Sequence, residues 1–275
     1  MASFWGCPRR FGAAVCAALA LLLAVDGPLR PAEASGPVMR WERGTCSRPL
    51  YFGITPDWPP YQYVSPSGSP LGDDVALIRE TAKVLGCPLV VEITSWSRLL
   101  SGLLSGKIDV IGGASWTKER ARNHHYSSPY RQETLGLFVR SADVGKLTLT
   151  GLSSFIGTPL RLGVVADTYI GGEYEKLVDD PAFKKIVVED PRQDQFALVA
   201  TKRIDAFLTD SGSGLYSIYR NGLDDTVTLY PGYLLDNGPV YYMFGKASVD
   251  ASVIAPFNKA LEDVLARRSA AGTQQ

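Results

Sequence analysis

Short apolar runs alternate with amphipathic stretches along most of the chain. In the first half, strands are predicted at Leu50–Thr55, Pro88–Ile93 and Lys107–Ile111. Apolar residues recur at helical spacing between them, which predicts helices at Asp73–Leu85 and Ser97–Ser105. Asp73 is the expected N-cap of the first helix, and Gly86 the residue that ends it. This order, with short connections, predicts a parallel sheet with right-handed crossovers.

The same order repeats after Tyr130. Strands are predicted at Arg161–Val165, Lys185–Glu189 and Ile204–Leu208, and helices at Tyr169–Val178, Gln193–Thr201 and Ser211–Tyr219. Two extended runs, Thr134–Arg140 and Val240–Phe244, flank this second unit. A closing helix is predicted at Val249–Arg267, interrupted near Pro256. Two units of roughly 100 residues each predict an α/β protein with two lobes, in place of one doubly wound sheet.

The first residues carry a pattern of a different kind. Arg9 and Arg10 precede an apolar run of 15 residues, Phe11–Val25, and Ala32-Glu33-Ala34 supplies a small-x-small cleavage pattern. The run is shorter than the ~18–20 residues that cross a bilayer, which argues against a membrane anchor. We therefore predict a cleavable signal peptide at residues 1–34 and a mature chain in the periplasm. Removing 34 of the 275 residues leaves 241.

Composition narrows the possible partners. The chain has 28 Lys and Arg against 28 Asp and Glu, and 45% of its residues are hydrophobic, as in a globular protein. No basic cluster is evident, so a nucleic-acid partner is not expected. The two His and four Cys offer little for a metal site with several ligands. We expect no metal and no cofactor.

Two cysteines remain once the predicted leader is removed. Cys46 precedes the first predicted strand and Cys87 precedes the second. If these strands are parallel neighbours, both cysteines lie at the same end of the sheet. An even pair in an oxidising compartment favours a disulfide over the alternative of two free buried thiols.

Five short motifs follow one another in the mature chain. They are Trp58-Pro59-Pro60-Tyr61, Ser105–Val110, Ser115–Arg120, Ser127–Tyr130 and Arg203–Asp210. Each motif is weak alone, but their order and spacing resemble the family 3 extracellular solute-binding proteins, the polar amino acid receptors of bacterial ABC importers. The resemblance implies an amino acid ligand, an inner-membrane ABC permease as partner, and a protein that works without covalent chemistry. We expect a monomer.

The resemblance also implies the periplasmic-binding-protein-like fold of type II. In that fold two hinge strands join two lobes, which close on a ligand between them. Thr134–Arg140 would be the outgoing hinge strand and Val240–Phe244 the returning one. Lobe I would then contain residues 35–137 and 240–275, and lobe II residues 138–239. Ligands of open α/β sheets bind at the carboxyl ends of strands, and the candidate site residues fall there.

An amino acid requires a cation for its carboxylate and an anion for its ammonium. Arg120 can hold a carboxylate through two parallel hydrogen bonds, and Ser115 and Thr117 can add hydroxyl donors. Without the resemblance, a solvated charge on a helix would be the better interpretation of Arg120. Asp210 directly follows a predicted strand and is placed to accept from the ammonium. The competing interpretation of Asp210 is an N-cap of the next helix.

Three aromatic residues, Trp58, Tyr61 and Trp96, match positions that enclose the ligand in the family. Their ring faces can also stack on an ammonium group. Tyr61 is favoured as a wall of the site, whereas Trp96 could equally be a packing residue at the start of a helix.

Thr168 and Tyr169 complete the predicted ligand contacts from lobe II. In the family a Gly-Thr pair at this position donates to the ligand carboxylate from a helix N-terminus. Here Asp167 replaces the glycine, and its charge would repel a carboxylate unless it points away. Gly113 is a second departure, since several relatives carry a hydroxyl residue there.

Enzyme classes are disfavoured. His124 and His125 are adjacent, so they cannot share a helix face as a metal pair and are expected at the surface. The cyclohexadienyl (arogenate/prephenate) dehydratases share this fold, but they carry a proton-donating acid at the position of Ile170, which has no proton to give. The chain is therefore predicted to be a binding protein and not an enzyme. The sequence leaves open a third function, as a periplasmic accessory protein of an oxidoreductase.

Overall fold

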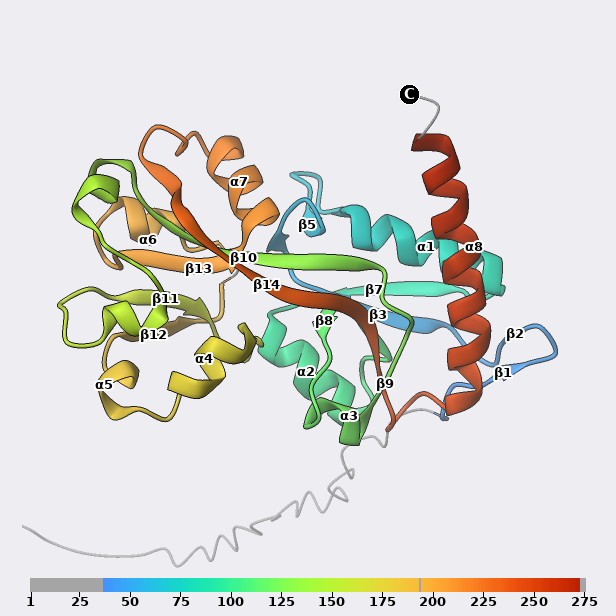
Figure 1. Cartoon of the computed structure of the whole chain (residues 1–275). Helices are drawn as coiled ribbons and strands as arrows, with labels where there is room; N and C mark the ends of the chain where they lie inside the picture. The colour runs from blue at the N-terminus through green and yellow to red at the C-terminus, as the bar shows by residue number, and fades with distance from the viewer. Residues whose placement is uncertain (1–36, 193, 273–275) are drawn as a thin grey trace, which may run out of the picture. The chain divides into compact units, whose positions relative to one another are not determined.

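The computed structural model describes residues 37–192 and 194–272. The predicted signal peptide lies outside the described residues. Several short strands precede the first helix, and both strands and helices follow along the rest of the described chain (Figure 1). None of the helices in these two ranges is long and apolar enough to cross a membrane.

The first strand–helix unit has the predicted parallel order. Strand β3 (Leu50–Ile54) lies between β7 (Leu89–Ile93) and β8 (Val110–Ser115) and is parallel to both. Helix α1 (Asp73–Leu85) connects β3 to β7, and α2 (Trp96–Ser105) connects β7 to β8. The predicted parallel arrangement of this unit is confirmed, although β8 runs on to Ser115. That extension places Ser115 at the carboxyl end of the strand.

The second unit repeats the arrangement. Strand β11 (Leu162–Val165) lies between β12 (Val187–Asp190) and β13 (Ala206–Asp210), again parallel to both. Its helices are short, and α4 begins two residues later than predicted. They are α4 (Gly171–Leu177), α5 (Pro181–Lys184), α6 (Phe196–Ala200) and α7 (Ser211–Arg220).

Two long antiparallel strands join the units. They are β10 (Arg131–Arg140) and β14 (Val227–Gly245), which pair with each other. Strand β10 also pairs with β13, and β14 with β8, so the strand order is β12-β11-β13-β10-β14-β8-β3-β7. Figure 1 shows β10 and β14 running from the second unit into the first. The two-lobe α/β fold with two hinge strands is confirmed.

The returning hinge strand is longer than the sequence pattern predicts. Only Val240–Phe244 was expected to be extended, whereas β14 starts at Val227. The run from Val227 to Pro239 contains Pro231, Gly232 and Gly238, residues that weaken strand signals in a sequence. The register of the β10–β14 pairing shifts between Glu133 and Thr134 and between Gly136 and Phe138, and at both places β14 carries the extra residues, so the pairing continues past them.

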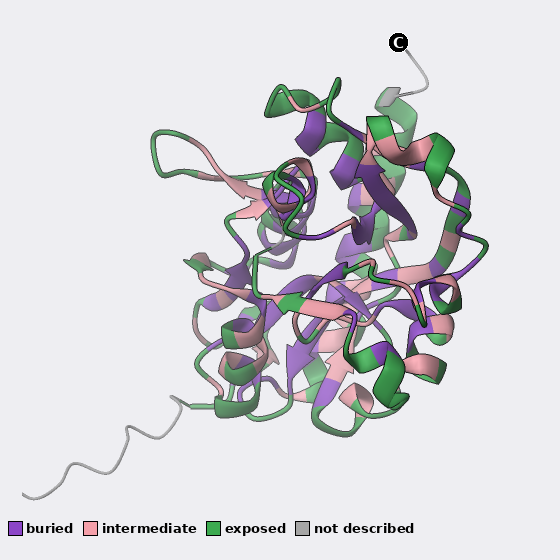
Figure 2. Ribbon diagram, turned by 90° about the vertical axis from the view of Figure 1, so that its left-hand side faces the viewer, coloured by how far each residue is buried: buried purple, intermediate pink, exposed green. Residues whose placement is uncertain are grey.

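Each unit packs around its own apolar cores. The cores of the first unit contain residues of β3, α1, α2, the end of β14 and the C-terminal helix. The cores of the second unit contain residues of β10, β11, β13, α4 and α7. Figure 2 shows the buried residues concentrated along the strands. Leu135 and Leu137 pack in a core of the second unit, although the predicted boundary at 137/138 assigns them to lobe I. The exact lobe boundaries stay a prediction.

Two predicted helix ends are wrong. Gly72, not Asp73, is the N-cap of α1, with a φ of 121°. A Cβ at Gly72 would collide with the Tyr61 carbonyl, so this close approach requires glycine. Pro256 does not interrupt the closing helix, because α8 (Ile254–Gly272) starts only two residues before it. Proline is tolerated in the first helical turn, where its missing N–H would have no partner.

Cys46 and Cys87 form the predicted disulfide, with their Cα atoms 5.0 Å apart. The parallel pairing of β3 and β7 brings both cysteines to the same sheet end, as the sequence suggested. The remaining elements are short and were not predicted. They are β1 (Trp41–Glu42), β2 (Thr45–Cys46), β4 (Asp57–Trp58), β5 (Gln62–Val64), β6 (Pro70–Leu71), α3 (Arg120–Asn123), β9 (His124–Tyr126), and the 3₁₀ helices Ser141–Lys146, Leu152–Phe155 and Ala251–Val253.

Candidate functional site

Arg120 lies between the two lobes. The chain turns after β8, where the Thr117 hydroxyl oxygen accepts a hydrogen bond from the Arg120 backbone N–H at 3.1 Å and so fixes the start of α3. The guanidinium donates from Nη1 to the Ser115 carbonyl at 3.3 Å and from Nη2 to the Asp167 carbonyl at 3.0 Å. Burial lowers the pKa of Arg120, but its ordinary value is so high that the group stays charged.

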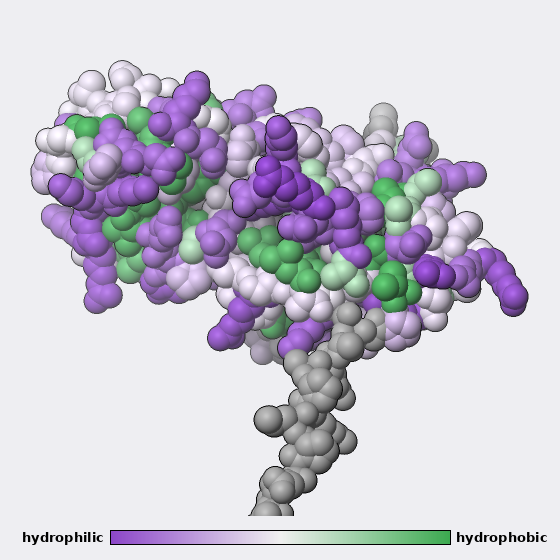
Figure 3. Space-filling view, turned by 90° about the horizontal axis from the view of Figure 1, so that it is seen from below, coloured by the Kyte–Doolittle hydropathy of each residue, from purple (hydrophilic) through white to green (hydrophobic). Residues whose placement is uncertain are grey.

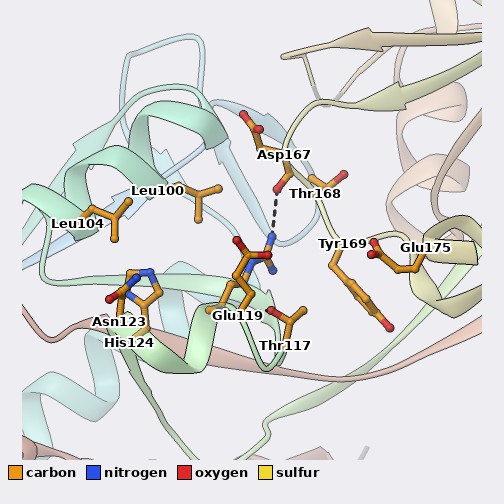
Figure 4. Close-up of a pocket in the computed structure, with 11 residues that line it drawn as sticks. Leu100, Leu104, Thr117, Glu119, Asn123, His124, Asp167, Thr168, Tyr169 and Glu175 are labelled. Carbon is orange, nitrogen blue, oxygen red and sulfur yellow. Dashed lines mark hydrogen bonds between the residues drawn. The ribbon is translucent and has the colours of Figure 1, made fainter. Parts of the chain in front are cut away.

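A second lobe I donor meets the same carbonyl. Trp96 Nε1 donates to the Asp167 carbonyl at 2.9 Å. Asp167 has a φ of 60°, and its side chain points away from the hydrogen-bonded carbonyl (Figure 4). Asp167 lines the groove described below and not the small cavity, and its repulsion of a ligand carboxylate stays a prediction. We call the contact of Trp96 and Arg120 with the Asp167 carbonyl the interlobe contact.

A small cavity of about 40 Å³ lies beside this contact. One water molecule occupies about 30 Å³ in the liquid, so an amino acid does not fit unless the lobes separate. The cavity brings together most of the predicted ligand contacts and two residues that were not predicted to bind. Its lining residues are Trp58, Trp96, Gly113, Ser115, Arg120, Glu133, Thr168 and Tyr169.

A larger groove of about 530 Å³ adjoins the cavity through Arg120, Thr168 and Tyr169. Thr117 lines this groove and not the cavity. Figure 4 shows charged and amide groups around it, including Glu119, Glu175 and Asn123. The face viewed in Figure 3 is largely polar, with small separate apolar patches. The apolar side chains of Leu100 and Leu104 also line the groove, so the approach to Arg120 is partly polar and partly apolar.

Tyr61 and Asp210 line neither the cavity nor the groove. Asp210 accepts from the Ser213 backbone N–H at 2.7 Å, so it caps α7. It also accepts from the Tyr61 hydroxyl, and burial raises its pKa. The capping interpretation of Asp210 is confirmed, and its contact with a ligand stays a prediction.

Arg131 occupies the aromatic faces that were assigned to a ligand. Its Cζ lies 3.8 Å from the Tyr61 ring centroid and 4.9 Å from that of Trp58. Its Nε is 3.4 Å from an oxygen of Asp74. Nη1 and Nη2 are buried and have no hydrogen-bond partner among the described residues. The chain's own guanidinium thus stacks where the sequence placed a ligand cation.

Glu133 is a lining residue that sequence reasoning missed. It lies on β10 with 7% of its surface exposed, and its Oε2 accepts from Asn237 Nδ2 at 2.6 Å. Burial raises its pKa to about 7, assisted by the nearby Asp210 and Asp74 and opposed by Arg131. The available signal was a charged residue at the edge of an apolar hinge strand.

Four more residues named in the sequence analysis have defined positions in the structure. Gly113 has a φ of 73°, and a Cβ there would collide with the Trp58 ring, so a hydroxyl residue would displace Trp58. The Thr168 hydroxyl donates to the Val165 carbonyl at 2.6 Å. Ile170 is buried in the lobe II core. The expectation that His124 lies at the surface is wrong, because it is buried on β9, and burial lowers its pKa to about 4.

These features define a class of protein: two α/β lobes on hinge strands, with a cavity between them lined by polar and aromatic groups. The sequence model of the bacterial extracellular solute-binding proteins, family 3, matches residues 50–273. The chain belongs to this family.

Similar proteins include an enzyme, an amino-acid-binding protein and a sensor domain. The chain is 28% identical to the cyclohexadienyl dehydratase of Pseudomonas aeruginosa over 207 residues, or 74% of this chain and 73% of the dehydratase. It is 26% identical to the L-cystine-binding protein TcyJ of Escherichia coli over 62% of this chain and 60% of TcyJ. A histidine kinase sensor domain with similarity to periplasmic binding proteins is 25% identical, with a TM-score of 0.68 over 81% of this chain and 92% of the domain.

Proposed function

We propose that this protein is the periplasmic substrate-binding protein of an ABC importer and binds an amino acid or similar small zwitterion between its lobes. The observation that carries the proposal is Arg120, whose Nη2 donates to a lobe II carbonyl beside the cavity. A ligand carboxylate would replace the Asp167 carbonyl and accept two hydrogen bonds from the same guanidinium. The TcyJ relative is an L-cystine-binding protein, which supports an amino acid ligand.

Binding at this position would couple to lobe movement. The carboxylate would join Arg120 of lobe I to Thr168 and Tyr169 of lobe II, which line the same cavity. A ligand that contacts both lobes favours the closed form by its difference in affinity for the two forms. An inner-membrane permease would then distinguish the liganded closed protein from the open one. The signal peptide, the periplasmic location and a monomeric state are parts of this proposal.

A thermal-shift screen of the twenty amino acids and L-cystine on the mature protein tests the proposal. One of them at 100 times its Kd is expected to add about 2.7 kcal/mol to the free energy of unfolding, because only the folded state binds it. The matching free carboxylic acid without the amino group serves as the control and is expected to stabilise less. If no amino acid stabilises the protein, the proposed function is contradicted.

One observation favours a second candidate, a dehydratase-like enzyme. Glu133 lines the cavity with a pKa of about 7, the property of a general acid, and a dehydratase is among the relatives. Against it, the predicted acid position holds the buried Ile170. We expect no turnover when the purified protein is incubated with prephenate or arogenate. Sustained product formation that disappears in Glu133→Gln would favour the enzyme over the receptor.

A further inference from the structure

The site needs a carboxylate that faces the same cavity as Arg120. Three buried carboxyl groups interact in this region, Asp74, Asp210 and Glu133. Asp74 pairs with Arg131 and does not line the cavity. Asp210 is already engaged by the backbone N–H of Ser213 and by the Tyr61 hydroxyl, and it does not line the cavity. Glu133 lines the cavity together with Arg120 and Ser115. A ligand whose carboxylate is held by Arg120 therefore has Glu133 within the same enclosure.

One oxygen of the Glu133 carboxyl group, Oε1, can accept a hydrogen bond from a ligand. Asn237 holds Oε2 at 2.6 Å, and no hydrogen bond joins Oε1 to any residue in the described ranges. Glu133 also lies where the β10–β14 register shifts, opposite Gly238 of the returning hinge strand. The side chain is thus anchored at the hinge and open on its cavity side. We propose that Glu133, rather than Asp210, receives the ammonium group of the ligand; this inference rests on the proposed function.

Charges around Glu133 determine how it responds to pH. Four ionisable groups act on it: Arg131 of its own strand, Asp74 of α1, Asp210 at the end of β13, and Arg120 of α3. Tyr169 shares the cavity. Arg131 favours the ionised form of Glu133, although Arg131 also pairs with Asp74, and the two nearby aspartates oppose ionisation. Burial outweighs Arg131 and the Asn237 hydrogen bond and raises the pKa of Glu133 to about 7, so the protein without ligand carries a proton there in mildly acidic solution.

An ammonium at Glu133 favours the ionised carboxylate, so binding should expel this proton. A proton and the ligand compete for the same carboxyl group below pH ~7, so the affinity for the ligand rises with pH by up to tenfold per unit until about pH 7. The pKa of His124 is lowered to about 4, so it does not titrate in this range. Arg120 stays charged throughout.

Titration calorimetry at pH 6 tests the inference, with the amino acid that gives the largest stabilisation in the screen. Heats measured in buffers of different ionisation enthalpy report the protons released. Wild type is expected to release close to one proton, and Glu133→Gln none. At pH 8 the variant is expected to bind about 10- to 150-fold more weakly, the range for a hydrogen bond to a charged group. Glu92→Gln, an exposed glutamate on β7, is the matched control.

The other outcomes distinguish a failure of this inference from a failure of the proposed function. The Asp210→Asn variant can still cap α7, because asparagine is a preferred N-cap. If it loses the proton release and Glu133→Gln keeps both release and affinity, the inference is overturned and the proposed function stands. Wild-type binding without proton release at pH 6 also overturns the inference. If no amino acid binds wild type, the proposed function fails and the inference fails with it.

Discussion

Replacing Asp74 by alanine is expected to lower the free energy of unfolding by about 3–5 kcal/mol, the range for breaking a buried ion pair. Asp74 is 1% exposed and is the partner of Arg131, whose Nη1 and Nη2 already lack hydrogen bonds among the described residues. Burial opposes the charge of Arg131, yet the surrounding acidic groups hold its pKa above the ordinary value. Without Asp74 the guanidinium would stay charged and buried with less compensation.

Denaturant unfolding of the purified variant measures this loss. Asp73→Ala is the matched control, since Asp73 is the adjacent residue, is exposed, and lies in the same first turn of α1. Its only expected loss is the attraction to the helix N-terminus, about 0.3–1 kcal/mol. Equal losses for the two variants would show that the Asp74–Arg131 pair does not stabilise the fold. Loss of the Gln62–Asp74 hydrogen bond is part of the Asp74 effect.

Removing the Arg120 side chain is expected to weaken ligand binding by about 2–5 kcal/mol, as for truncating one partner of a buried charge pair. Arg120 is the guanidinium that lines both the cavity and the groove. Calorimetry on Arg120→Ala with the best ligand of the screen measures the effect. Arg120→Lys should recover only part of it, because an ammonium cannot form two parallel bonds to a carboxylate.

The matched control for Arg120 is Arg122→Ala, which removes an exposed arginine of the same short helix α3. Its affinity for the ligand should equal that of wild type. Unchanged affinity in Arg120→Ala would contradict the assigned role. Because Arg120 also holds the Asp167 carbonyl, a folding check by circular dichroism accompanies the measurement.

Much of the fold followed from the sequence because its strands are short runs rich in β-branched and aromatic residues. The parallel neighbours β3 and β7, and the disulfide at their common end, could be predicted in this way. The first part of β14 could not, since Pro231 and Gly232 interrupt its pattern and only pairing with β10 holds it extended.

The site was harder to predict. Arg120 and Ser115 belong to a recognisable motif, and the structure places both at the cavity. Arg131 and Glu133 were overlooked because charged residues at a strand edge are usually solvated. Their burial depends on Tyr61, Asp74 and Asn237, residues far away in sequence. Asp210 remained ambiguous, since the same carboxylate suits a helix cap and a ligand.

If Arg120 holds the ligand carboxylate as proposed, the interlobe contact competes with the ligand for the same guanidinium. The Asp167 carbonyl is covalently attached to lobe II, so it meets Arg120 at a high local concentration that no dilution reduces. An amino acid can use the guanidinium only in the fraction of molecules where this contact is open, and the apparent Kd rises as that fraction falls. Trp96 donates to the same carbonyl without supplying charge, so under the proposed function it is expected to shift the range of ligand concentration over which the site fills.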